Sequence, residues 1–163
     1  MKLLDWLLHN VLTRANPARM FSRQLVRVNG ESMLPALRPG QWVRVDRAAY
    51  NKLPAQRFDI VRFEDPSRPG RWSVKRIAGL PGETVVLDKG VLAVNGAPVT
   101  EPHLPQPHTD SEYHEWQLKD GEYVVLGDNR GAAGVTDSRR YGPVKSAAIV
   151  GRVVRTGESA PSP

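Results

Sequence analysis

From residue 24 onward, the chain consists of short apolar or alternating runs that Gly, Pro, Asp and Asn residues separate. Val and Ile dominate these runs, as is typical of β-strands. The pattern predicts a predominantly β fold, an antiparallel sheet or partial barrel around a single hydrophobic core, with a hairpin turn at residues 88–90. The runs are QLVRV (24–28), QWVRV (41–45), FDIVRF (58–63), RWSVKRIA (71–78), ETVVL (83–87), VLAVNG (91–96), EYVVLG (122–127) and AAIVGRVVR (147–155).

The first 23 residues follow a helical pattern instead. Leucines, Trp6 and Val11 recur over residues 3–12 at spacings that give a helix one broad apolar face. Such a helix rises about 15 Å, half of the roughly 30 Å hydrocarbon thickness, and is too short to span a bilayer. Asp5 interrupts the run and no small-residue cleavage site follows, which is unlike a secretory signal. The amphipathic helix predicted over residues 1–23 therefore lies in a membrane interface or packs on the domain.

Residues 98–118 form the one long segment without strand periodicity. Prolines at positions 98, 102, 105 and 107 favour an extended, Pro-rich surface excursion. Residues 157–163 are predicted to be a flexible tail, which leaves residues 24–156 as a single domain. The irregular spacing of the potential ligands in the excursion disfavours a metal site, and no cofactor is expected. These ligands are His103, His108, Asp110, Glu112, His114 and Glu115.

The composition is that of a globular protein, with 40% hydrophobic and 25% charged residues among 163. The absence of cysteine excludes a disulfide framework, a cysteine protease and a Cys-based zinc site. The net charge is +6, and the basic residues concentrate in the first half of the chain. That half either faces an anionic surface or is an ordinary solvated face, because its arginines are scattered. No nucleic-acid partner is expected.

The segment NGESMLPALRPG, residues 29–40, places Ser32 on a loop stiffened by prolines. This serine is either a turn hydroxyl or a nucleophile, and a nucleophile needs a neighbouring group that accepts its proton. No histidine lies on a predicted strand, so a lysine kept neutral by desolvation is the alternative base. Lys75 alone among the lysines lies in an apolar strand pattern. It is either a buried base or a strand-edge lysine that extends to water.

A third stretch, VLGDNRGAAGVTDSRRYGPV at residues 125–144, is rich in small and polar side chains. Such residues form either an ordinary surface loop or a tight loop that fixes its neighbours through side-chain hydrogen bonds. Together and in this order, the three stretches resemble bacterial type I signal peptidases, a family of serine–lysine proteases. The resemblance covers residues 26–154 and is carried by GESMLPALRPGQWV, DIVRFEDP with VKRIAGLPGE, VNGAPVTEPHL, and GDNRGAAGVTDSRRYGPV with AAIVGRV.

The resemblance implies a β fold of the signal-peptidase type and a serine endopeptidase. Its substrate would be a preprotein or precursor peptide that loses an N-terminal signal or leader segment after a small residue. By position, Ser32 becomes the nucleophile and Lys75 the general base. The backbone N–H of Ser32 would help to form the oxyanion hole, and Gly30 stands where some members carry a second hydroxyl donor. Met33 and Pro35 would shape the substrate cleft.

Further residues match the positions that support the dyad in the family. Asp137 and Arg139 would form an ion pair that buttresses the site. The supporting residues implied by the resemblance are Asp128, Asn129, Asp137, Ser138 and Arg139.

One departure from the family's pattern concerns the loop after residue 127. It is two residues longer than usual, and Val135 stands where the family has a serine whose hydroxyl orients the lysine. Thr136 or Ser138 replaces that hydroxyl only if the longer loop directs one of their side chains towards the lysine.

A second departure is that no membrane-spanning helix precedes the serine, as one does in the family. Three functions therefore stay open. The first is a peripheral membrane enzyme attached to anionic lipid through residues 1–23. The second is a soluble cytoplasmic maturation protease, like those that trim the nickel superoxide dismutase precursor. The third is a non-catalytic membrane-surface module that retains the fold. A self-cleaving repressor is disfavoured because no helix-turn-helix pattern is evident.

Overall fold

The computed structural model describes residues 23–104 and 112–155, which fold into two antiparallel β-sheets with little helix. Every predicted Val- and Ile-rich run overlaps one of the strands, so the predominantly β prediction is confirmed. The elements are β1 (Arg23–Arg27), β2 (Trp42–Asp46), β3 (Ile60–Glu64), β4 (Trp72–Gly79), β5 (Thr84–Asp88), β6 (Val91–Val94), β7 (Ala97–Pro98), β8 (His114–Gln117), β9 (Glu122–Leu126), α3 (Ser138–Tyr141), β10 (Val144–Lys145), the 3₁₀ turn η1 (Ser146–Ala148) and β11 (Ile149–Arg155).

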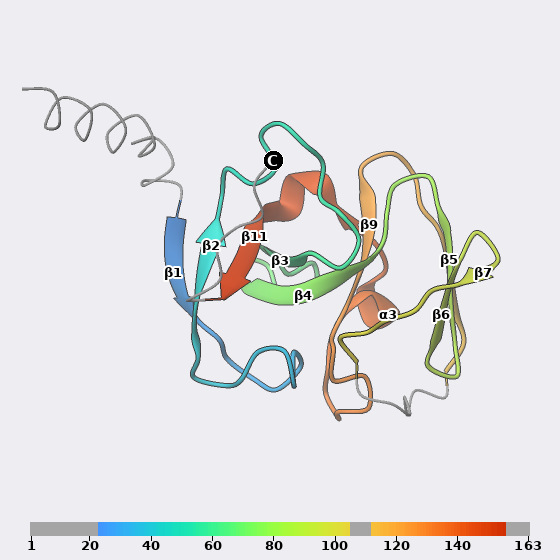
Figure 1. The fold of residues 1–163 in the computed structure, drawn as a ribbon, viewed down its shortest axis with the longest axis horizontal. Helices are drawn as coiled ribbons and strands as arrows, with labels where there is room; N and C mark the ends of the chain where they lie inside the picture. Colours follow the sequence, from blue (N-terminus) through green and yellow to red (C-terminus); the bar gives the residue numbers. More distant parts are fainter. Residues whose placement is uncertain (1–22, 105–111, 156–163) are drawn as a thin grey trace, which may run out of the picture.

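The larger sheet has the strand order β1-β2-β11-β3-β4-β9-β10, and the smaller sheet has the order β7-β6-β5-β8. In Figure 1, β1 and β2 lie at the left, β5, β6 and β7 lie at the right, and β4 and β9 run between them. The expected hairpin turn is present. Asp88 pairs with Val91, and the connecting residues Lys89 and Gly90 both have positive φ, as a two-residue hairpin turn requires.

Gly79 lies at the end of β4, where the chain passes from the larger sheet towards the smaller one. A Cβ at this position would lie 2.6 Å from Cγ2 of Val85 and 2.9 Å from Cδ1 of Leu118. The pairing of β4 with β9 also changes register here, between Ile77 and Gly79. Only glycine allows the backbone of β4 to approach the smaller sheet this closely.

The buried apolar residues form three clusters, rather than the single core expected from the sequence. One cluster joins the smaller sheet to β9 and includes Val85. The larger sheet is covered on both faces, because successive residues of β3 contribute to different clusters. Val61 belongs to a cluster with β9, whereas Ile60 packs on a cluster that includes Met33 and Leu37 of the β1–β2 connection. The side of β3 that carries Ile60 therefore packs beneath the loop that carries Ser32, and the side that carries Val61 packs with β9.

Much of the described part of the Pro-rich surface excursion predicted at residues 98–118 has regular or buried structure, which its lack of strand periodicity did not indicate. Residues 114–117 form β8, which pairs with β5 and places Trp116 opposite Val85. Glu101 and Leu104 are buried. In the sequence HEWQ, Trp116 is the one large apolar residue, and it packs, partly buried, on the cluster of the smaller sheet. This single side chain and the pairing with β5 stabilise β8 in place of an apolar run. Residues 105–111 lie outside the described part of the chain.

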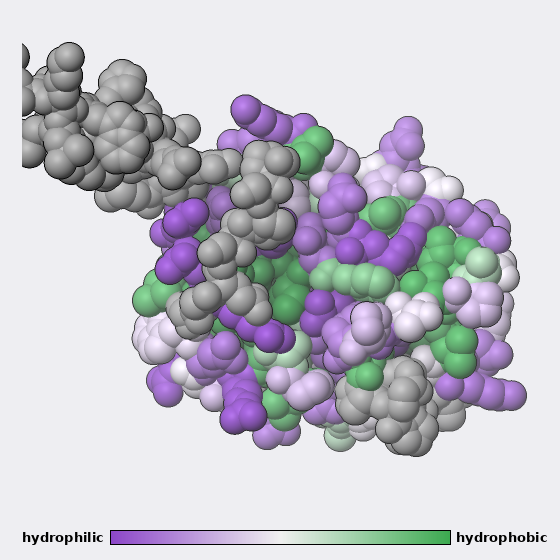
Figure 2. All heavy atoms as spheres, viewed as in Figure 1, coloured by the Kyte–Doolittle hydropathy of each residue, from purple (hydrophilic) through white to green (hydrophobic). Residues whose placement is uncertain are grey.

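The predicted N-terminal helix lies outside the described residues, except for Arg23, which begins β1. The predicted tail at 157–163 also lies outside them. Within residues 23–104 and 112–155, no helix is long and apolar enough to cross a membrane. On the face drawn in Figure 2, hydrophobic residues occur in separate groups between hydrophilic ones, so this face carries no single broad apolar patch.

Candidate active site

Ser32 lies in the connection between β1 and β2. Backbone hydrogen bonds within this connection and two buried apolar side chains fix its conformation. The N–H of Leu34 donates to the carbonyl of Glu31 (3.1 Å), and the N–H of Leu37 donates to the carbonyl of Met33 (2.7 Å). The side chains of Met33 and Leu37 are fully buried in the cluster beneath the loop. The hydrophobic effect thereby fixes the backbone around Ser32, while the serine itself stays partly exposed.

Lys75 projects from β4 towards this serine. Its Nζ lies 2.7 Å from the Oγ of Ser32 and also donates to the carbonyl of Val74 at 3.2 Å. The side chain is buried, with 5% relative exposure. The structure therefore brings together the two residues predicted as nucleophile and base, and it places Lys75 in the interior rather than extended to water.

The surroundings of Lys75 favour the neutral amine. Burial lowers its pKa below the ordinary value of 10.5, because an ammonium loses hydration in the interior. The carboxylates of Asp137 and Asp65 oppose this effect, and the guanidinium groups of Arg68 and Arg139 reinforce it. Each carboxylate thus has an arginine that offsets its charge, and desolvation decides the direction of the shift.

The stretch that follows β9 docks directly on the nucleophile loop. The N–H of Asn129 donates to the carbonyl of Ser32 (3.0 Å), and its side-chain amide donates to the carbonyl of Glu31 (3.2 Å). A Cβ at Gly127 would lie 2.7 Å from the carbonyl oxygen of Ser32. Gly127 therefore allows two segments that are distant in sequence to approach closely, and the hydrogen bonds of Asn129 stabilise this contact.

Asp137 organises the other end of this stretch. It is fully buried, caps α3 by accepting from the N–H of Arg139 (3.1 Å), and accepts from the N–H of Gly127 (2.9 Å). Its carboxylate also pairs with the guanidinium of Arg139 at 2.9 and 3.0 Å. The ion pair implied by the family resemblance is thus present. Ser138 has a different place, since its Oγ accepts from the N–H of Val125 in β9 (2.9 Å).

Sequence reasoning missed the partner of Asp128. Nε and Nη2 of Arg76 donate to the two carboxylate oxygens of Asp128 at 2.9 and 2.7 Å, and Nη1 donates to the carbonyl of Phe58. Arg76 follows Lys75 directly, so in a strand its side chain points to the opposite face. That alternation is the sequence signal that distinguishes the two residues. Lys75 faces the serine, and Arg76 binds Asp128 in the loop after β9.

A cleft of about 1190 Å³ surrounds the dyad. Gly30, Ser32 and Met33 line it as expected, whereas Pro35 is exposed and lies outside the lining. Gly30 has a φ of +84°, which a glycine adopts without strain. The cleft is bordered by these residues: 26–33, Arg62, Ser67, Arg68, 70–75 and 132–136.

Val135 and Thr136 both line the cleft, but neither is hydrogen-bonded to Lys75. The Cγ1 of Val135 lies 3.1 Å from the position that a Cβ on Gly127 would take, so the valine turns towards β9. The carbonyl of Val74 accepts the second hydrogen bond of the lysine. Within the described residues, the second partner of the amine is therefore a backbone carbonyl of β4, and not the hydroxyl that the resemblance implied.

Among the described residues of the 98–118 segment, the potential metal ligands do not converge. Within residues 23–104 and 112–155, no group of three His, Asp or Glu side chains could hold a metal ion. His103 lies near Glu101 (3.7 Å) and Asp128 (3.9 Å), whereas His114 stacks on Trp116 in β8. His108 and Asp110 lie outside the described part.

Comparison with known proteins assigns the family. A sequence model described as "Signal peptidase, peptidase S26" matches residues 4–156. The chain belongs to this family. Signal peptidase I V of Bacillus subtilis (strain 168) is 36% identical over 138 residues, which are 77% of this chain and 80% of the relative. Signal peptidase I of Leptolyngbya laminosa is 32% identical over 160 residues, 89% of this chain and 77% of the relative.

A solved structure supports the same assignment. The crystal structure of a signal peptidase I from Enterococcus faecalis V583 matches with a TM-score of 0.53 and 31% identity, over 61% of this chain and 97% of that chain. Membership of the peptidase S26 family confirms the predicted resemblance and makes the protein a serine peptidase. The half-barrel β fold is likewise that of the family.

Proposed function

We propose that the protein is an endopeptidase in which Ser32 attacks the substrate and Lys75 accepts the serine proton. The 2.7 Å hydrogen bond between Nζ and Oγ carries this proposal, because it connects a nucleophile directly to a base. Burial supports the assignment, since it lowers the pKa of Lys75 and so increases the fraction of neutral amine at a given pH.

The reaction proceeds through an acyl-enzyme. Neutral Lys75 takes the proton of Ser32 as Oγ bonds to the peptide carbonyl carbon. The backbone N–H of Ser32, which has no acceptor within the described residues, donates to the developing oxyanion. The lysine then protonates the leaving amine, and the peptide bond breaks. Water that has lost a proton to the same lysine hydrolyses the ester and regenerates Ser32.

An extended peptide reaches the dyad along β4. β9 pairs with β4 only from Arg76 onward, so in the described part of the chain the edge from Trp72 to Lys75 has no strand partner on that side. Unpaired backbone groups of such an edge form main-chain hydrogen bonds with an added strand. The cleft follows this edge, which supports binding of the substrate as an extended strand.

The substrate class follows from the relatives, which are named signal peptidases. The protein removes an N-terminal signal or leader segment from a preprotein or precursor and cuts after a small residue. The test is digestion of an unbiased peptide library and of a peptide with an Ala-x-Ala segment, followed by mass spectrometry. Ser32→Ala and Lys75→Ala should reduce cleavage to background, whereas Lys145→Ala, an exposed lysine, should not. Cleavage that persists in Lys75→Ala contradicts the mechanism.

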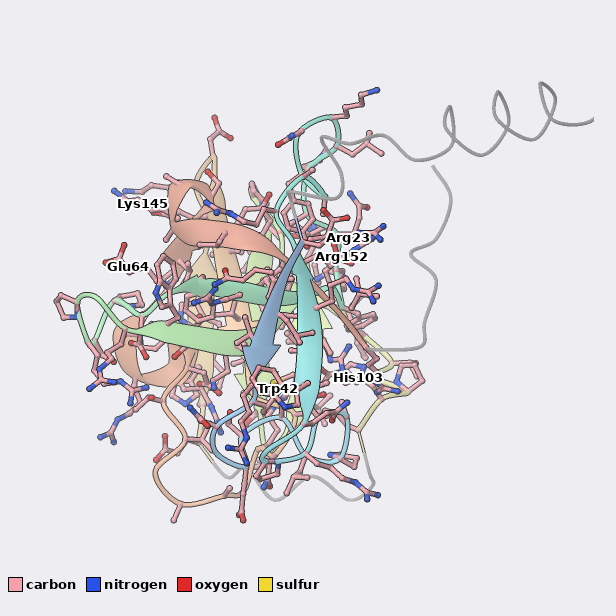
Figure 3. The ribbon with its side chains drawn as sticks, turned by 90° about the vertical axis from the view of Figure 1, so that its left-hand side faces the viewer. Arg23, Trp42, Glu64, His103, Lys145 and Arg152 are labelled. Carbon is pink, nitrogen blue, oxygen red and sulfur yellow. The ribbon has the colours of Figure 1, made fainter. Side chains whose placement is uncertain are left out.

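We also propose that residues 1–23 attach the protein peripherally to an anionic membrane. The strand that follows supports this, because Leu25 is 57% exposed and Trp42, in the adjacent strand, is 53% exposed. Arg27 pairs with Trp42 in the register of β1 and β2. Figure 3 shows Arg23 and Trp42 at opposite ends of this strand pair. Tryptophan and arginine together suit a lipid interface.

Sedimentation with vesicles that contain anionic lipid tests this attachment. The full chain should sediment with them, and deletion of residues 1–22 should abolish sedimentation without loss of peptide cleavage. Unchanged sedimentation after the deletion rules out attachment through this segment. A full chain that stays in the supernatant favours the soluble maturation protease.

A further inference from the structure

A second buried carboxylate lies beside the dyad and has no role in the reaction as derived above. Asp65 follows β3 directly and has 1% relative exposure. It accepts hydrogen bonds from the N–H and Oγ of Ser67 (2.9 and 2.6 Å) and from the Oγ of Ser73 (2.6 Å). The guanidinium of Arg68 donates to the same carboxylate at 2.8 and 3.2 Å. Such a set of donors is typical of an ionised carboxylate.

Ser73 connects this carboxylate to the strand that carries the base. Ser73 and Lys75 alternate along β4, so both project to the same face, at a separation of about 7 Å between their Cα atoms. Both side chains are buried. The hydrogen bond from Ser73 to Asp65 therefore holds the connection after β3 against the face of β4 from which Lys75 reaches Ser32.

The carboxylate is ionised at neutral pH. Burial alone would raise the pKa of Asp65, but the hydrogen bonds from Ser67, Ser73 and Arg68 outweigh burial and lower the pKa from 3.8 to about 2. An unbalanced negative charge at this position would stabilise the ammonium form of Lys75 and so suppress the base. The paired cation, Arg68, offsets that charge.

The charged groups around Lys75 form two such units. On one side stand Asp65 and Arg68, and on the other stand Asp137 and Arg139. The phenol of Tyr141, from α3, is buried nearby and stays neutral because desolvation and both carboxylates raise its pKa. Each carboxylate has an arginine partner that offsets part of its effect on the amine, and burial is the largest influence on the pKa of Lys75.

We propose that Asp65 and Arg68 form a positioning pair for the base, in which Asp65 fixes β4 through Ser73 and Arg68 prevents that carboxylate from holding Lys75 as an ammonium. This inference rests on the proposed function. It assigns specific roles to two residues outside the dyad and outside the supporting set that the family resemblance implied.

Arg68 is suited to an experimental test because its side chain is 60% exposed while its head group pairs with a buried carboxylate. Its replacement changes charge without opening a core cavity. The measured quantity is the acidic limb of the pH profile of kcat/KM, with an Ala-x-Ala peptide as substrate. This limb reports the pKa of the base in the free enzyme.

The two single substitutions should move this limb in opposite directions. Arg68→Gln leaves the charge of Asp65 unbalanced, so the limb should move to higher pH by roughly half a unit. This shift is smaller than one caused by a charge in direct contact with the amine, because solvent screens the interaction. Asp65→Asn leaves Arg68 unbalanced and should move the limb to lower pH. Arg68→Lys should restore the wild-type limb, and the double substitution should bring it close to wild type.

A purely structural role would reduce kcat without this pattern of shifts. The matched control is Arg140→Gln, which removes one positive charge from α3 and should leave the limb in place. A limb that does not move in Arg68→Gln, or moves to higher pH in Asp65→Asn, overturns the inference. If Arg68→Gln does not fold, Asp65→Asn decides by itself. Cleavage that does not require Ser32 and Lys75 overturns the proposed function instead.

Discussion

The backbone N–H of Asn129 donates a 3.0 Å hydrogen bond to the carbonyl oxygen of Ser32. Because this bond joins main-chain atoms, it fixes the nucleophile loop independently of the serine side chain. Lys75 is fixed separately, by the pairing of β4 with β3 and by the carbonyl of Val74. The distance within the dyad therefore depends on how closely the stretch after β9 packs on the β1–β2 connection, although that stretch carries neither member.

Gly127→Ala should strongly reduce the activity of the enzyme while leaving it folded. The added Cβ would lie 2.7 Å from the carbonyl oxygen of Ser32, so the nucleophile loop must shift. A displacement of about 1 Å at a reacting group can reduce the rate by about 100-fold, and a loss of that order in kcat/KM is expected. The measurements are peptide cleavage and a thermal melt of the same sample.

The control for this substitution is Gly96→Ala. Gly96 has a φ of +81° and no atom within 4 Å of an added Cβ, so alanine there introduces backbone strain far from the dyad. The variant should lose about 1 kcal/mol of stability and keep its activity. Equal activity loss in both variants would mean that general destabilisation, rather than displacement of Ser32, explains the effect.

Lys75→Met should stabilise the fold at neutral pH while abolishing cleavage. Burial lowers the pKa of Lys75 in the folded state below 10.5. Between the folded-state pKa and 10.5, only the unfolded state binds the proton, so the stability of the native protein rises as the pH rises through this window. Methionine has a similar length and does not titrate. The gain in stability of Lys75→Met over the wild type should therefore be largest at low pH.

The measurement is the difference in melting temperature between Lys75→Met and wild type at about pH 6 and at about pH 10. This difference should shrink as the pH rises. Lys145→Met, at an exposed position, should give a difference that does not change with pH. A difference for Lys75→Met that grows with pH would show that the lysine is held as an ammonium.

Most strands were predictable from the sequence because their Val- or Ile-rich runs bury alternate residues, as Val61 and Phe63 of β3 do. Ser32 and Lys75 could be named from the resemblance, and the structure brings them together. β8 could not be predicted, since HEWQ contributes a single large apolar side chain, Trp116, and depends on pairing with β5.

The partners of the buried carboxylates were also beyond sequence reasoning. Asp128 with Arg76 and Asp65 with Arg68 show only as charged residues in turns or strands, and a periodicity of two cannot distinguish a buried carboxylate from an exposed one. The burial of Asp65 and Asp128 depends on how their loops pack against β4, and only the folded chain specifies this.

Asp128→Ala should be among the most destabilising single changes in the described chain. The carboxylate has a side-chain exposure of 1%, and the guanidinium of Arg76 has 12%. Without Asp128, the arginine keeps only the carbonyl of Phe58 as a partner, and an uncompensated buried cation costs about 3–5 kcal/mol. Urea denaturation measures this loss. Asp88→Ala, at an exposed hairpin position, should change stability by less than about 0.5 kcal/mol.

Val135→Ser tests whether the enzyme needs the hydroxyl that the resemblance places at this position. The Nζ of Lys75 already donates to the carbonyl of Val74 at 3.2 Å, and the valine side chain turns towards Gly127. A serine at 135 should therefore leave kcat and the acidic limb of the pH profile unchanged, because the amine is oriented by β4 itself. Thr136→Val should be equally neutral towards that limb. An increase in kcat of about tenfold in Val135→Ser, equivalent to about 1.4 kcal/mol of transition-state stabilisation, would show instead that the backbone carbonyl orients the lysine poorly.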